Sequence, residues 1–221
     1  MPPRLRLRGA GPVNPLAPLL RAWRSAPLAG VDEAGRGCLA GPVVAAAVIL
    51  PWAPRLRGLA DSKRLSASQR ETLHKRIEER ALAVGIGLAE PSEIDALNVL
   101  RATHLAMRRA LDALSVIPSL VVVDGYPVHG LSFEQTALID GDERFAPVSA
   151  ASIIAKVWRD HMMLRYETEF PGYGFAIHKG YGTPGHLKAL RSLGPCPIHR
   201  MSFDPVAAIC EPRLTMRGGG D

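Results

Sequence analysis

Four carboxylates are the residues of this chain with the clearest chemical potential. Asp32 and Glu33 come at the end of one apolar segment, Asp124 ends a second, and Asp142 follows a third. A carboxylate beside a hydrophobic sheet is costly to bury unless it is paired or bound to a metal ion. Because strands of one sheet can bring their ends together, we expect these four side chains to lie close to one another.

A cluster of this kind would repel itself at neutral pH without cations. Mg²⁺ and Mn²⁺ prefer oxygen ligands and would suit it. Two such ions a few ångströms apart support in-line displacement at phosphorus, one by activating water and the other by stabilising the leaving oxygen. The pattern therefore indicates a metal-dependent phosphoryl-transfer enzyme. On spacing alone, aspartates that only cap turns are an equally good interpretation.

The segments that must position these carboxylates alternate between strand and helix patterns. The first two strands, near 30–33 and at 43–50, are expected to form an antiparallel hairpin with a long connection. Strands first, then strands alternating with helices, predict an α/β fold with a mixed sheet. Further strands are predicted at 84–89, 119–123 and 136–139, and helices at 66–80, from 92 onward, at 149–166 and at 187–193.

Two helix patterns are specific enough to name buried residues. Ser66-Ala67-Ser68-Gln69 is a capping-box pattern, and the helix that follows should bury Leu73 and Ile77. In the helix from Ser92 onward, apolar positions repeat at intervals of four and three residues and predict one buried stripe. That stripe comprises Leu100, His104, Met107, Leu111 and Leu114.

Positive charge is concentrated at the amino terminus. The net charge is +6, and residues 1–30 carry five arginines and no acidic residue. A basic arm favours polyanions, although a solvated tail has the same composition. Because prolines interrupt this arm, we predict that residues 1–27 are a basic, disordered extension, and that residues 206–221 are a flexible tail.

Composition also excludes some classes of protein. The longest apolar stretch, Val43 to Leu50, is far shorter than the roughly 18 residues of a membrane helix. The three cysteines are scattered and suggest neither a disulfide framework nor a metal knuckle. We therefore expect a cytoplasmic protein from a reducing compartment.

Six ordered motifs between residues 28 and 205 resemble those of the ribonuclease HII family. They are Gly30-Val31-Asp32-Glu33-Ala34-Gly35-Arg36-Gly37 with Ala40-Gly41-Pro42-Val43, then Asp61-Ser62-Lys63, Val123-Asp124-Gly125, Ser149-Ala150-Ala151-Ser152-Ile153-Ile154-Ala155-Lys156-Val157, His178-Lys179-Gly180-Tyr181-Gly182-Thr183, and Gly194-Pro195-Cys196-Pro197-Ile198-His199-Arg200-Met201-Ser202-Phe203.

The resemblance implies a ribonuclease H-like catalytic domain over residues 28–205. Its fold would be a mixed sheet flanked by helices, with a small helical C-terminal part. The implied activity is cleavage of the RNA strand of RNA–DNA hybrids, and cutting on the 5′ side of single ribonucleotides in duplex DNA, leaving 3′-hydroxyl and 5′-phosphate ends. Such an enzyme would serve in removing embedded ribonucleotides and RNA primers.

The resemblance also implies the metal ligands, which would hold two divalent cations, Mn²⁺ or Mg²⁺. They would be Asp32, Glu33, Asp124 and Asp142, which are also the catalytic residues. For the fourth ligand, Asp140 and Glu143 lie close in the sequence. Whether either assists Asp142 stays open.

The same resemblance implies how substrate would be bound. Gly35, Arg36 and Gly37 would sense a ribose 2′-hydroxyl, since glycines let a backbone approach a sugar closely. Tyr181 would stack on the neighbouring sugar. Lys63, Lys156 and Lys179 fall inside motifs and suit phosphate contacts, although helix propensity and solvation explain them equally well.

The expected partners are RNA–DNA hybrids and ribonucleotide-containing duplex DNA, bound by a monomer. The C-terminal tail carries no sliding-clamp peptide with paired aromatics, so no protein partner is indicated. Two alternatives stay open. One is a different two-metal nuclease on the same fold, which would lack the Gly-Arg-Gly and Lys-Gly-Tyr-Gly segments. The other is an inactive hybrid-binding module, against which the presence of all four carboxylates argues.

Overall fold

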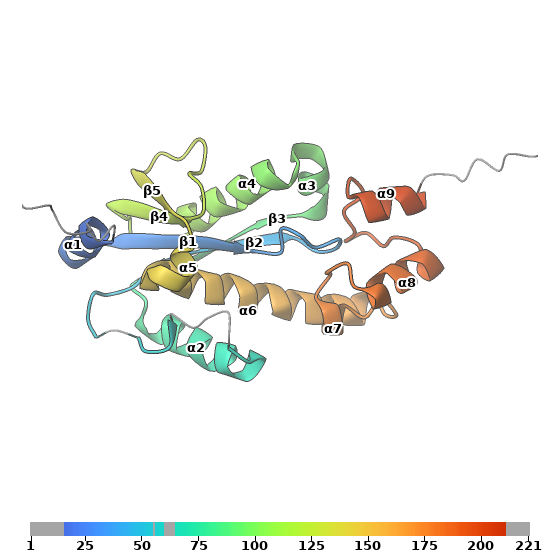
Figure 1. The fold of residues 1–221 in the computed structure, drawn as a ribbon, viewed down its shortest axis with the longest axis horizontal. Coiled ribbons are helices and arrows are strands. Elements are labelled where there is room, and N and C mark those ends of the chain that lie inside the picture. Colours follow the sequence, from blue (N-terminus) through green and yellow to red (C-terminus); the bar gives the residue numbers. More distant parts are fainter. Residues whose placement is uncertain (1–15, 55, 60–64, 211–221) are drawn as a thin grey trace, which may run out of the picture.

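The computed structural model describes residues 16–54, 56–59 and 65–210. Within these residues, five strands form one sheet in the order β3-β2-β1-β4-β5 (Figure 1). Strand β1 pairs antiparallel with β2 and parallel with β4, so the sheet is mixed, as predicted. The strands are β1 Leu28–Ala34, β2 Val43–Ile49, β3 Ala83–Ala89, β4 Leu120–Asp124 and β5 Gln135–Leu138.

Helices cover both faces of the sheet. The long helix α6 crosses one face with α2 outside it, α4 covers the other face, and α7, α8 and α9 gather at one end (Figure 1). The helices are α1 Ala17–Ser25, α2 Ala67–Arg80, α3 Pro91–Leu97, α4 Val99–Asp112, α5 Gly141–Arg144, α6 Ala146–Glu169, α7 Phe175–His178, α8 Pro184–Leu193 and α9 Asp204–Cys210. The arrangement confirms the expected α/β architecture, a mixed sheet flanked by helices with a helical C-terminal part.

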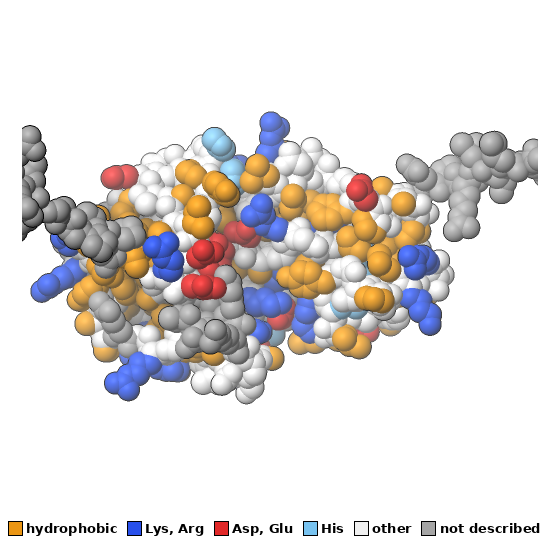
Figure 2. Space-filling model, in the orientation of Figure 1, with side chains coloured by type: hydrophobic (Ala, Val, Ile, Leu, Met, Phe, Trp, Pro, Cys, Tyr) orange, Lys and Arg blue, Asp and Glu red, His pale blue; other side chains and the backbone are white. Residues whose placement is uncertain are grey.

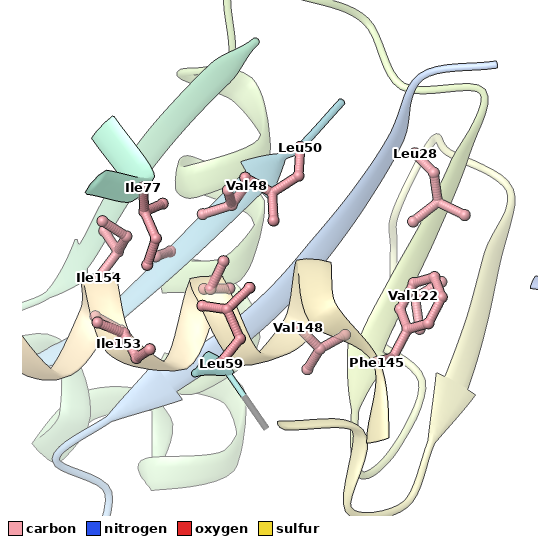
Figure 3. Packing of buried hydrophobic residues seen from close by; sticks show 14 of the residues in the cluster. Leu28, Val48, Leu50, Leu59, Ile77, Val122, Phe145, Val148, Ile153 and Ile154 are labelled. Atoms are coloured by element: carbon pink, nitrogen blue, oxygen red, sulfur yellow. The ribbon is translucent and has the colours of Figure 1, made fainter. Parts of the chain in front are cut away.

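Successive side chains of β1 point to opposite faces of the sheet, so they belong to two separate hydrophobic clusters. Leu28 packs with Val122 and with Val148 of α6 in the cluster on the α6 side (Figure 3). Val31 belongs to the cluster on the opposite side, which includes Met107 of α4. The apolar strands are therefore buried on both faces, and polar side chains at their ends are confined to the edge where the strands stop.

Helix α2 forms as its capping box predicts. The Ser66 hydroxyl accepts a hydrogen bond from the Gln69 amide, and the Gln69 side chain accepts one from the Ser66 amide. Leu73 and Ile77 are buried, as expected. Two backbone amides at the start of the helix gain a partner in this way.

The single helix expected from Ser92 onward is two helices, and that prediction is wrong. Asn98 adopts a φ of 73° and ends α3, and its side chain accepts hydrogen bonds from two amides in the first turn of α4. The first helix begins at Pro91, with Glu90 rather than Ser92 as its cap. Within α4 the predicted stripe is buried at His104, Met107 and Leu111, whereas Leu100 in the first turn is exposed.

Part of the N-terminal arm predicted to be disordered is the helix α1. Trp23 is buried, and its indole N–H donates to the Leu50 carbonyl at 2.8 Å. Its ring also meets Trp52 and Phe145 edge to face, at 5.1 and 5.5 Å between centroids. The prediction failed for residues 17–25 because a proline in the first turn of a helix starts it rather than breaks it. Residues 1–15 lie outside the described part.

The predicted flexible tail is likewise helical over residues 206–210. These residues belong to α9, whose Val206 is fully buried. Val206 packs with Leu39 and Leu190, so a short apolar helix closes the end of the molecule. The rest of the predicted tail, 211–221, lies outside the described residues. Among the helices described, none is long and apolar enough to cross a membrane.

Truncating Trp23 to alanine is expected to destabilise the protein by about 3–5 kcal/mol, the range for removing a large buried aromatic side chain. Urea unfolding followed by circular dichroism measures the change. Arg21→Ala is the matched control, because this side chain is exposed on the same helix. If both variants unfold at the parental urea concentration, α1 does not contribute to the core.

Candidate functional site

Parallel pairing of β1 and β4 brings their carboxylates to one edge of the sheet. Val31 pairs with Val123, so Asp32 and Asp124 occupy the next positions of neighbouring strands. Asp142 is in the first turn of α5, which is linked to β4 because the Gly141 amide donates to Asp124 Oδ1 at 2.7 Å. The clustering predicted from strand ends is therefore present in the fold.

The environment of these carboxylates opposes their ionisation. Burial raises the pKa of Asp32 well above its usual range, the charges of Glu33 and Asp124 raise it further, and a hydrogen bond from Ser152 lowers it. Burial also raises the pKa of Glu33, against the lowering effect of Arg36, whose guanidinium lies 3.0 Å from Glu33 Oε1. The fold therefore holds negative charges together at a cost that nearby positive charge would offset.

A pocket of about 310 Å³ opens beside this cluster. Glu33 and Asp142 contribute acidic groups to its wall, and Arg70 and Lys156 contribute basic ones. Tyr181, which is 45% exposed, lies at the same wall. Acidic side chains gather near the centre of the face shown in Figure 2, over α5, with basic side chains around them. Such a mixture suits a phosphodiester. The basic side chains can pair with its negative charge, and the acidic side chains can hold metal ions beside the reacting phosphorus.

The structure separates the three acidic candidates near residue 142. Asp142 is buried and lines the pocket with Glu33. Asp140 is exposed, in a left-handed backbone conformation before α5, and Glu143 is exposed beside a different pocket. The geometry therefore favours Asp142 over its neighbours as the fourth member of the cluster.

The donor chemistry of the cluster fits a hard divalent cation, since its oxygens are carboxylate oxygens held in a partly desolvated place. Among the residues described here, however, no three Asp, Glu, His or Cys side chains are arranged ready to hold a metal ion. Part of the reason is visible in their hydrogen bonds. Asp124 Oδ1 accepts from Gly141, Asp32 Oδ1 accepts from the Glu33 amide at 2.7 Å, and Glu33 is paired with Arg36.

The Gly-Arg-Gly turn, residues 35–37, lies next to this pocket. Gly35 has a φ of 95°, and a Cβ there would be 2.0 Å from the Arg159 side chain. Gly37 is exposed, and a Cβ there would meet nothing within 4 Å. The fold thus requires glycine at position 35. At position 37 the fold would accommodate a side chain, and the glycine there leaves the backbone exposed.

Two buried arginines hold the loops around the pocket, and the sequence analysis missed both. Arg200 donates to the carbonyls of Gly35, Arg36 and Gly41 at 2.7–3.0 Å. Arg159 donates to the carbonyls of Pro42, Ala40 and Lys179 at 2.8–3.1 Å. In the described part of the chain, neither guanidinium has a carboxylate within 4 Å. Both donate their hydrogen bonds to backbone carbonyl oxygens instead.

The lysines predicted to bind substrate are placed differently from one another. Lys156 lines the pocket, 2.7 Å from Asp160 Oδ1 and 5.9 Å from the centre of the Tyr181 ring. Lys179 instead donates to the carbonyl of Ala176 within its own helix turn, and it does not line that pocket. Lys63 lies outside the described residues. Of the two lysines that the structure describes, Lys156 is the one at the pocket.

The chain is similar to proteins named ribonuclease HII. The family described as Ribonuclease HII matches residues 29–206. Ribonuclease HII of Paraburkholderia xenovorans (strain LB400) is 57% identical over 178 residues, covering 80% of this chain and 72% of the relative. Ribonuclease HII of Coxiella burnetii (strain Dugway 5J108-111) is 50% identical over 190 residues, covering 86% and 94%.

The fold is also similar to solved structures. The crystal structure of ribonuclease H2 from Pyrococcus horikoshii OT3 superimposes with a TM-score of 0.72 at 30% sequence identity. The match covers 82% of this chain and 96% of the archaeal one.

Proposed function

This chain belongs to the ribonuclease HII family and is a ribonuclease H endonuclease, and from this premise we propose that it acts on two related substrates. It hydrolyses the RNA strand of RNA–DNA hybrids, and it cuts on the 5′ side of single ribonucleotides embedded in duplex DNA. The products carry 3′-hydroxyl and 5′-phosphate ends. The observation that carries the proposal is that Glu33 and Asp142 of the acidic cluster line one pocket together with Gly35, the first residue of the Gly-Arg-Gly turn.

Asp32, Glu33, Asp124 and Asp142 are the proposed catalytic residues and metal ligands. Two divalent cations held there, Mn²⁺ or Mg²⁺, would supply an activated water and stabilise the leaving 3′-oxygen. The chain's own contribution is to hold these four oxygen donors at adjoining strand and helix ends, where burial and mutual repulsion favour cation binding. Bound positive charge would lower the raised pKa values of Asp32 and Glu33 and so favour their ionised forms.

The proposed substrate contacts follow the walls of the pocket. The backbone of the turn at Gly35, Arg36 and Gly37, with Gly35 at the pocket wall and Gly37 exposed, reads the ribose 2′-hydroxyl, the group that separates RNA from DNA. Lys156 faces a phosphate, and Tyr181 stacks on the next sugar. Lys63 and Lys179 stay proposals for outer phosphates, and Lys179 would first have to leave the Ala176 carbonyl.

A panel of four duplexes tests this proposal. Duplex DNA, duplex RNA, an RNA–DNA hybrid and duplex DNA with one ribonucleotide are incubated with the enzyme in Mg²⁺, in Mn²⁺ and in EDTA. We expect cleavage of the hybrid and of the single-ribonucleotide duplex in the presence of either metal, and none in EDTA. Cleavage of pure DNA would indicate a different two-metal nuclease. Hybrid binding without cleavage would indicate an inactive binding module.

Tyr181→Ala is expected to slow cleavage at a single embedded ribonucleotide by on the order of 10- to 100-fold, because small misplacement of the reacting phosphate is expensive. Duplex affinity should change little, since phosphate contacts supply most of it. Tyr181→Phe should be milder because the ring face remains. Single-turnover cleavage and gel-shift binding on the same duplex measure the two effects. Equal losses of binding and cleavage, or no loss, would remove Tyr181 from this role.

A further inference from the structure

Three histidines lie behind the Tyr181 loop, which comprises residues 179–183. His186 is fully buried and His199 is 2% exposed. The ring of His178 stacks on that of His186 at 4.3 Å between centroids and 13° between planes. None of the three lines the pocket beside the acidic cluster. Their chemistry is therefore not used by the proposed reaction, and their burial calls for another role.

Backbone partners set the tautomer of each ring in the pair. The Cys196 amide donates to His199 Nδ1 at 3.0 Å, so this nitrogen is an acceptor and His199 carries its proton on Nε2. His199 Nε2 lies 3.0 Å from His186 Nε2 and donates to it. His186 then carries its proton on Nδ1, which donates to the Tyr181 carbonyl at 2.9 Å. One unbroken line of hydrogen bonds runs from Cys196 to Tyr181.

Burial keeps the two histidine rings of this line in their neutral forms. Desolvation and, to a smaller extent, the neighbouring His186 lower the pKa of His199 to about 4. Desolvation likewise lowers the pKa of His186. Both rings are therefore neutral at pH 7, and a neutral imidazole has one donor and one acceptor nitrogen. Reversing both rings would take the acceptor from the Cys196 amide and would leave the Tyr181 carbonyl with one donor, the Thr183 amide, in place of two.

The same C-terminal segment also reaches the Gly-Arg-Gly turn. Arg200, next to His199, donates to the carbonyls of Gly35 and Arg36, each at 2.7 Å. The Arg200 amide donates to the Leu39 carbonyl at 2.9 Å, and the Leu39 amide donates to the Gly180 carbonyl at 2.8 Å. Residues 196–200 thus hold the Gly-Arg-Gly turn through the Arg200 guanidinium. They hold the Tyr181 loop through the His199 ring, which is bonded to the His186 ring.

We propose that His186 and His199 are positioning residues, which fix the Tyr181 carbonyl through a relay of defined tautomers and so set the Tyr181 loop against the Gly-Arg-Gly turn. The catalytic consequence rests on the proposed role of Tyr181, whereas the structural consequence does not. Neither histidine touches the reacting atoms. Their effect is to fix the distance between the Tyr181 loop and the Gly-Arg-Gly turn before any substrate is bound.

Two substitutions of His186 separate the two ends of the relay. Asparagine places its amide nitrogen near the position of histidine Nδ1, so His186→Asn keeps a donor for the Tyr181 carbonyl. Glutamine reaches the position of Nε2, so His186→Gln keeps the link to His199 and loses the one to Tyr181. A residue needed only for packing would suffer similarly in both variants.

Amide hydrogen exchange tests the positioning without substrate. The Thr183 amide donates to the Tyr181 carbonyl at 2.8 Å and therefore reports on the loop. In His186→Gln we expect the Thr183 amide to exchange at least about tenfold faster, which corresponds to the loss of one hydrogen bond, and in His186→Asn within about threefold of the parent. The Val122 amide in the sheet is the internal reference. Equal rates in both variants would overturn the proposal.

Nitrogen-15 spectra of the parental protein at pH 7 supply a measurement that needs no variant to fold. The relay requires a proton on His199 Nε2 and on His186 Nδ1. The opposite tautomer at either ring, or a doubly protonated ring, would overturn the proposal.

A double-substitution cycle with Tyr181→Ala tests the catalytic consequence. If His186 acts through Tyr181, His186→Gln should slow single-ribonucleotide cleavage about tenfold or more alone, and add little when Tyr181 is already alanine. Multiplied losses would show that His186 acts independently of Tyr181, and would overturn this part of the proposal. A Tyr181→Ala variant with parental activity would instead contradict the proposed function, while the exchange rates and tautomers still decide the relay.

Discussion

Asp124→Asn is expected to abolish cleavage and leave the fold intact. The amide oxygen can still accept the hydrogen bond from Gly141 that joins β4 to α5, so the local structure loses no partner there. The variant does lose a negative charge from the proposed metal site. Changing even the outer partners of metal ligands costs about 10–100-fold, so we expect the loss of a ligand to exceed about 100-fold in single-turnover rate.

A second measurement on the same variant requires no activity. Asp124 is one of the charges that raise the pKa of Asp32 and of Glu33, so removing it relieves repulsion in the metal-free protein. Since a raised carboxyl pKa costs stability at every pH well above the ordinary value of the group, Asp124→Asn should unfold at the parental temperature or higher at pH 7 in EDTA. Asp140→Asn is the control, because Asp140 is exposed and outside the pocket. Parental cleavage by Asp124→Asn in both metals would remove Asp124 from the site.

Arg200→Met is expected to destabilise the protein by at least about 3 kcal/mol. Methionine fills much of the same volume, but the carbonyls of Gly35, Arg36 and Gly41 lose a buried donor, and an unpaired buried group costs about 1–3 kcal/mol. Burial lowers the pKa of the Arg200 guanidinium to about 10, so it stays charged at neutral pH and its loss removes charge-assisted hydrogen bonds.

Urea unfolding of Arg200→Met, beside the exposed control Arg191→Met, measures this loss. Arg200→Lys should recover little of it, because an ammonium group cannot reproduce the fork that reaches three carbonyls at once. Variants that do not unfold should also cut single ribonucleotides more slowly, since the Gly-Arg-Gly turn has lost its anchor. Parental stability of Arg200→Met would show that the turn is held by other contacts.

The parts of the fold that follow local rules could be predicted from the sequence. The apolar strands, the Ser66 capping box and the meeting of Asp32 with Asp124 all depend on short-range pattern or on the pairing of neighbouring strands. Glu33 and Asp142, which the resemblance named as metal ligands, line the same pocket. These features are the ones that the structure reproduces most closely.

The errors arose where long-range contact overrides a local pattern. The helix α1 looked like a disordered, proline-interrupted arm because nothing local shows that Trp23 packs on Phe145. The buried role of Arg200 depends on carbonyls about 160 residues earlier in the chain. The relay through His186 and His199 was equally hidden, since a tautomer depends on partners that only the fold brings together.

Mapping the cut in a DNA duplex that contains one ribonucleotide tests the central claim most directly. Both strands are labelled at their ends, the reaction is run in Mg²⁺ and in Mn²⁺, and the product ends are identified by enzymatic treatment and gel mobility. The account predicts one cut on the 5′ side of the ribonucleotide, in its strand alone, with 3′-hydroxyl and 5′-phosphate ends. An uncut duplex, cuts at deoxyribonucleotide positions, or a cut in the complementary strand would contradict it.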